Sequence, residues 1–72
     1  MKRRFEFVEG NSAKFWEIST SGADVTVTFG RLGAAGQSQT KTLANAEAAA
    51  KHANQLIAEK TKKGYQEVAH TS

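Results

Sequence analysis

The sequence of 72 residues contains no cysteine. Disulfide bonds and thiolate metal sites are therefore excluded, and the composition fits a reducing compartment. The two histidines, His52 and His70, cannot form a metal site by themselves, and no acidic cluster accompanies them. We therefore expect a protein that holds no metal ion and needs no cofactor.

Long apolar runs are also missing. No run approaches the ~18–20 residues of a membrane-spanning helix, and no apolar signal-peptide segment follows the basic residues Lys2–Arg4. These absences predict a cytoplasmic protein without a membrane partner. We expect Lys2–Arg4 to be a ragged, solvated terminus rather than a phosphate-binding arm.

The excess of positive charge is small. Ten basic and seven acidic residues give a net charge of +3, and the sequence pI is about 9.5. A balance of this kind permits binding to nucleic acid without requiring it. The length predicts one small basic domain with a limited core, ordered from about residue 4 to residue 68, and we expect it to be a monomer.

The residue patterns of an enzyme are absent from the sequence. There is no cysteine nucleophile, no serine lies in a nucleophile elbow, and the carboxylates are scattered. The segment Gly30–Gly36 has neither the spacing of a phosphate-binding P-loop nor its strand-and-helix context. His52 is predicted to have a structural or solvated role. We therefore expect no catalytic residues and no small-molecule substrate.

Alternation of apolar and polar residues predicts four strands, with turn clusters at 10–13 and 21–24. The expected strands are Phe5–Glu9, Lys14–Thr20, Asp24–Arg31 and Gln37–Leu43, joined as a meander of antiparallel hairpins. The second has an aromatic residue on each face, Phe15 and Trp16, so alternation leaves its buried face open. The fourth is polar, which is typical of an edge strand, and Lys41 would protect it from pairing with another chain.

One long helix is predicted over Ala46–Lys63, with Asn45 as its N-cap and Gly64 just after its C-terminus. Lys60 lies near its apolar face and would have to extend its ammonium group back to water. The residues expected to face the sheet are Ala46, Ala49, Ala53, Leu56 and Ile57.

The segment Tyr65–Val68 is predicted to be a last strand or a packed tail, and Ala69–Ser72 to be disordered. Strands followed by a helix indicate an α+β fold, in which a small antiparallel sheet is covered on one face by the helix.

The stretch Thr28–Gly33 places an aromatic residue, a glycine and an arginine at the end of the most strongly patterned strand. Phe29 continues the apolar face of this strand, so it either completes the core or contacts a partner. Glycine weakens a strand interior, so Gly30 marks a bulge or a close approach to the backbone. Arg31 is the stronger functional candidate, because a charge at a strand end has little use in a core.

Several blocks of the chain together resemble the WGR domain family, small modules named after a Trp-Gly-Arg triplet at a strand end. The blocks are Phe7–Ile18, Val25–Gly33, Gly36–Ser38 and Ala58–Tyr65. Such modules occur in poly(ADP-ribose) polymerases and in bacterial proteins, some of them short and stand-alone. One departure is that Phe29 occupies the position of the signature tryptophan.

The resemblance implies a single WGR-like domain over residues 1–72 that binds nucleic acid without catalysis. We expect DNA in preference to RNA, contacted at its backbone or at strand ends. By position, Phe29 would stack on a sugar or base, Arg31 would hold a phosphate or a partner's carboxylate, and Gly30 would permit close approach. Gln37 and Lys41 would add polar contacts. The alternative is a protein-interaction or interdomain-relay module that uses the same surface.

Overall fold

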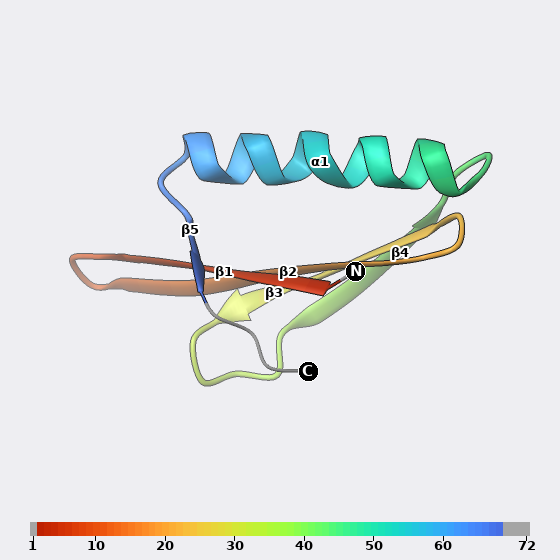
Figure 1. The fold of residues 1–72 in the computed structure, drawn as a ribbon. Coiled ribbons are helices and arrows are strands. Elements are labelled where there is room, and N and C mark those ends of the chain that lie inside the picture. The colour runs from red at the N-terminus through yellow and green to blue at the C-terminus, as the bar shows by residue number, and fades with distance from the viewer. Residues whose placement is uncertain (1, 69–72) are drawn as a thin grey trace.

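The computed structural model describes residues 2–68, and the fold is a single antiparallel sheet with one helix. The elements are β1 (Lys2–Glu9), β2 (Ser12–Ser21), β3 (Asp24–Arg31), β4 (Gln37–Thr42), α1 (Ala46–Lys62) and β5 (Gln66–Val68). The sheet order is β4-β3-β2-β1-β5, and α1 lies across one face of it (Figure 1). The predicted α+β fold is confirmed, and β5 adds a strand to the four expected. Within residues 2–68 no helix is long and apolar enough to cross a membrane.

Two tight turns set the register of the central strands. Ser21 pairs with Asp24 around the turn at Gly22, and Glu9 pairs with Ser12 around the turn at Gly10. Both glycines have φ of 57°, a left-handed conformation that two-residue hairpin turns require. The β2–β3 register that follows decides which side chains meet at the far end of this hairpin.

The core lies between α1 and one face of the sheet. Ala49 and Ala53 are fully buried, and their small side chains let the helix approach the strands closely. Ala46 is exposed, so the buried stripe begins one turn later than predicted, at Ala49. The buried cluster consists of Phe5, Trp16, Ile18, Val25, Ala49, Ala53 and Ile57.

Both ends of α1 follow the local sequence signals. The Asn45 side-chain oxygen accepts a hydrogen bond from the Ala48 backbone N–H at 2.8 Å, as an N-cap does. The helix ends at Lys62, one residue earlier than predicted, and Lys63 is its C-cap. Gly64 then takes a φ of 106°, which reverses the chain toward β5.

The N-terminal segment is not the ragged terminus that the sequence predicted, because β1 begins at Lys2. Arg3 donates two hydrogen bonds of 2.7 Å to the carboxylate of Glu67, which ties β5 to β1. Arg4 donates to Glu17 at 2.6 Å and to Glu6 at 3.2 Å on the opposite face. Glu67 and Glu17 come from other strands, so the local sequence did not reveal their contacts with the two arginines. The predicted disorder of Ala69–Ser72 concerns residues outside those described.

Candidate functional site

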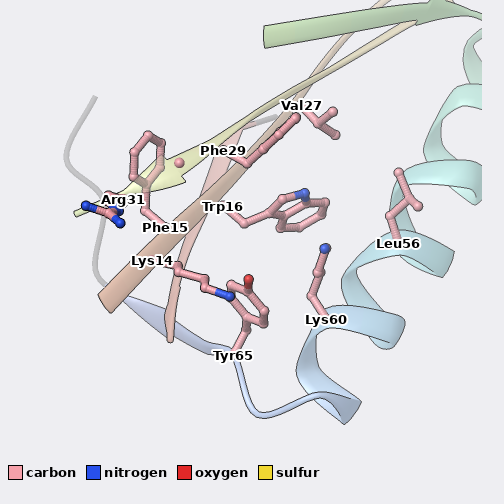
Figure 2. A pocket seen from close by; sticks show the side chains of 10 residues that line it. Lys14, Phe15, Trp16, Val27, Phe29, Arg31, Leu56, Lys60 and Tyr65 are labelled. Carbon is pink, nitrogen blue, oxygen red and sulfur yellow. The ribbon is translucent and has the colours of Figure 1, made fainter. Parts of the chain in front are cut away.

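A groove lies between the C-terminal half of α1 and the β2–β3 hairpin. Its volume is about 550 Å³, and we call it the aromatic groove. Trp16 and Phe29 are directly opposite one another in the strand pairing and form its floor. The lining residues, shown in Figure 2, are Lys14, Phe15, Trp16, Val27, Phe29, Gly30, Arg31, Leu56, Lys60 and Tyr65. They include three cations and no carboxylate, so the groove suits an anionic ligand that has a flat apolar part.

Two of these cations face each other across the hairpin. Lys14 and Arg31 are register partners in β2 and β3, and both are exposed. Within residues 2–68 neither has an ion pair or a side-chain hydrogen bond. Like charges directly opposite each other destabilise a sheet. The pair therefore favours a bound anion, which would offset the repulsion.

Lys60 supplies the third cation from the helix side. Its ammonium nitrogen lies 5.7 Å from the ring centroid of Trp16 and 5.3 Å from that of Tyr65. Partial burial lowers the pKa of Lys60 below its usual value, the charges of Lys63 and Lys14 lower it further, and Glu59 raises it. An anion in the groove would reverse this shift by stabilising the charged form.

The indole N–H of Trp16 is an unused hydrogen-bond donor in the groove. Trp16 is only 4% exposed, yet among the described residues its nitrogen has no hydrogen-bond partner. It is also not among the buried polar atoms left without a partner, so the nitrogen reaches solvent. Figure 2 shows it on the edge of the ring nearest Phe29 and Val27. Phe29 lacks the N–H of the tryptophan that the WGR resemblance implies at its position, and Trp16 places one directly across the strand from it.

The depressed pKa of Lys60 makes a prediction about stability and pH. As pH rises toward 10.5, the folded protein should release this proton before the unfolded chain does. The unfolded chain then binds more protons, so the stability rises with pH in that window. Relative to Lys60→Met, the wild type should gain stability in urea unfolding as the pH rises toward 10.5. A difference that stays constant, or that shifts toward the variant, would contradict this assignment.

The structure brings together only some of the residues that the sequence nominated. Phe29 and Arg31 line the groove, and Gln37 is the register partner of Phe29 in β4. Lys41 lies toward the other end of β4, about 13 Å from Gln37 at ~3.3 Å per residue. It lines a different hollow, beside His52.

A contact within the chain itself explains why residue 30 is a glycine. A Cβ atom on Gly30 would lie 2.8 Å from the Cα of Gly36 and 3.5 Å from the ring of Phe15. The close approach expected at this position is therefore made by the protein's own backbone, on the sheet face opposite Phe29. Phe15 is buried there, 4.7 Å beneath the guanidinium of Arg4. The second strand thus buries an aromatic residue on each face, which settles the ambiguity that alternation left.

Sequence reasoning missed Lys14, Trp16, Lys60 and Tyr65 as members of the site. The signal for the first two was present, because a two-residue turn at Gly22 and Ala23 sets the register that places Lys14 opposite Arg31. Lys60 and Tyr65 reach the groove only through the packing of α1 on the sheet and the reversal at Gly64. No local pattern indicates that placement.

Comparisons with known proteins find a matching family profile and several similar proteins. The family profile described as the WGR domain matches residues 1–72. The chain is similar to two proteins of Escherichia coli (strain K12), the uncharacterized protein YfeS and the protein YehF, with 46% and 43% identity over 93% of this chain. It spans 28% and 24% of their lengths. It also resembles a crystal structure of a Bacteroides fragilis protein, at 52% identity and a TM-score of 0.93, over 96% of this chain and 20% of that one.

Proposed function

The chain belongs to the WGR domain family, and we propose that it is a non-catalytic module that binds nucleic acid, DNA in preference to RNA, at the backbone or at strand ends through the Phe29–Arg31 region. WGR domains are generally nucleic-acid-binding modules in polymerase-like proteins. The comparisons indicate no catalytic family. In this chain the ligand would enter the aromatic groove.

The observation that supports this proposal best is the facing pair of Lys14 and Arg31 beside the aromatic floor. A phosphate between the two cations would relieve their repulsion, and its sugar or base would reach Phe29. Stacking of a base on an aromatic side chain contributes roughly 1–3 kcal/mol and tolerates any sequence. Phosphate contacts likewise do not depend on sequence. The expected binding is therefore sensitive to salt and insensitive to base sequence.

Replacing Arg31 by alanine should weaken nucleic-acid binding without unfolding the protein. Loss of a charge-assisted contact costs roughly 1.5–3 kcal/mol, about ten- to a hundredfold in affinity, and the salt slope should become shallower by about 0.9 for a duplex. Because the repulsion between Arg31 and Lys14 disappears, the free energy of unfolding should stay constant or rise by up to about 1 kcal/mol. Fluorescence titration of an end-labelled duplex at two salt concentrations, together with urea unfolding, measures both effects.

The control for this substitution is Lys62→Ala, which removes an exposed charge that lines neither the aromatic groove nor the hollow beside Lys41. Equal loss of affinity in both variants would show that only overall charge matters and would remove the groove from the proposal. Absence of binding at low salt to duplex, nicked or single-stranded DNA and to RNA would overturn it. A protein partner captured by the wild type and lost in Arg31→Ala would then support the protein-interaction alternative.

A further inference from the structure

The aromatic groove does not end at the residues described above, because a second and a third hollow continue it in opposite directions. The second, of about 270 Å³, shares Val27 and Leu56 with the groove and runs between α1 and the edge strand β4. Its other lining residues are Val25, Gln39, Thr40, Lys41 and His52. The third, of about 340 Å³, shares Lys14 and Arg31 with the groove and lies beside the turn of the β1–β2 hairpin.

The three hollows form one track, and each of them is lined by at least one cation. Lys41 lies at the β4 end, Lys60 in the middle, and Lys14 with Arg31 at the other end. None of the residues that line the three hollows is a carboxylate. Elsewhere in the described chain, four of the seven carboxylates accept hydrogen bonds from other side chains: Glu67 from Arg3, Glu6 and Glu17 from Arg4, and Asp24 from Thr42.

The length of the track suits several nucleotides rather than one. Val25 and Arg31 lie at the two ends of the stretch of β3 that it follows. At ~3.3 Å per residue this stretch is about 20 Å long. Nucleotides stacked at ~3.4 Å would place about six phosphates along it, and a more extended strand would place fewer.

From this arrangement we infer that the ligand is a single strand of nucleic acid, which lies along the whole track from Arg31 to Lys41. The inference rests on the proposed function and specifies its ligand. In a duplex the faces of the bases are covered by their neighbours except at the ends, so only an unpaired strand can present successive bases to an aromatic floor while a row of cations follows its phosphates. This reading also gives Lys41 a place in the site, although it lies far from Phe29.

The inference is tested by titrating labelled oligothymidylates of increasing length, from about two to about ten nucleotides. Affinity should rise with length up to about six nucleotides and then level off. A duplex with a single-stranded overhang of about six nucleotides should bind more tightly than the same duplex with blunt ends. Lys41→Ala should weaken binding of the longer oligomers by roughly threefold or more and reduce the salt slope by about 0.7.

The matched control is Lys51→Ala, because Lys51 is also an exposed lysine, on α1, and lines none of the three hollows. Circular dichroism of both variants confirms that they are folded. Three results together would show that the single-strand track is wrong while the proposed function stands. They are an affinity independent of oligomer length, an overhang without effect, and the same behaviour of Lys41→Ala and Lys51→Ala. If no nucleic acid binds at low salt, both fail.

Discussion

Replacing Gly36 by alanine should destabilise the protein more than any other single methyl group added to its loops. Gly36 has a φ of 78°, which side chains rarely adopt, and a Cβ atom there would lie 2.5 Å from the carbonyl oxygen of Phe29 and 2.7 Å from the ring of Phe15. The backbone conformation costs roughly 1–3 kcal/mol and the overlap a further ~1–3 kcal/mol. For a chain of this size the whole stability is roughly 4–10 kcal/mol. Urea unfolding should therefore show a largely unfolded or strongly weakened variant.

The loop contains its own control. Gly33 also has a positive φ, of 91°, but a Cβ atom on it would meet nothing within 4 Å. Gly33→Ala should therefore lower the free energy of unfolding only by the cost of the backbone conformation, about 1 kcal/mol or slightly more. Equal destabilisation by the two substitutions would show that the contact between Gly36, Gly30 and Phe15 does not hold this loop in place.

The functional importance of Gly36 follows from the same contact. The backbone of Gly36 packs against Phe15 and Gly30 on one sheet face, while Phe29 and Arg31 point to the other. Displacement of the loop would therefore move the strand end that presents both candidate ligand-binding side chains. A folded fraction of Gly36→Ala is expected to bind nucleic acid less tightly, although none of its charges has changed.

Replacing Trp16 by alanine is expected to have the second large effect, because the floor of the groove is also part of the core. Trp16 is 4% exposed, belongs to the buried cluster and packs against Phe5 at a centroid distance of 5.6 Å. Truncation of a buried tryptophan to alanine costs roughly 3–5 kcal/mol. That is comparable with the whole stability of so small a chain. Thermal and urea unfolding should show an early, broad transition or none.

Trp16→Phe is the matched control, since it keeps an aromatic ring and removes the indole N–H. It should retain most of the stability and lose part of the affinity for nucleic acid, as expected if the unused N–H donates to a bound ligand. If Trp16→Ala unfolds at the same denaturant concentration as the wild type, Trp16 does not support the core as described. Unchanged affinity in Trp16→Phe would leave the indole without a role in binding.

Several features of the fold were predictable from the sequence. The bounds of β3, the Asn45 cap and the reversal at Gly64 were predicted and are confirmed. Each depends on alternation, capping or turn chemistry among residues close together in the chain. The resemblance to the WGR family rests on ordered sequence blocks and is likewise confirmed.

Other features depended on residues that are distant in sequence and adjacent in space. Lys2–Arg4 joined β1 because Glu67 and Glu17 meet these arginines from other strands. Phe15 and Trp16 are both buried because Gly30 and Gly36 cover one and α1 covers the other. The sequence pattern alone therefore determined the fold class, the bounds of β3, the start of α1 and the family, since these follow from chemistry among neighbouring residues. Only tertiary packing decided how Lys14, Trp16, Arg31 and Lys60 surround one groove, because strand register and the position of the helix must act together to place them.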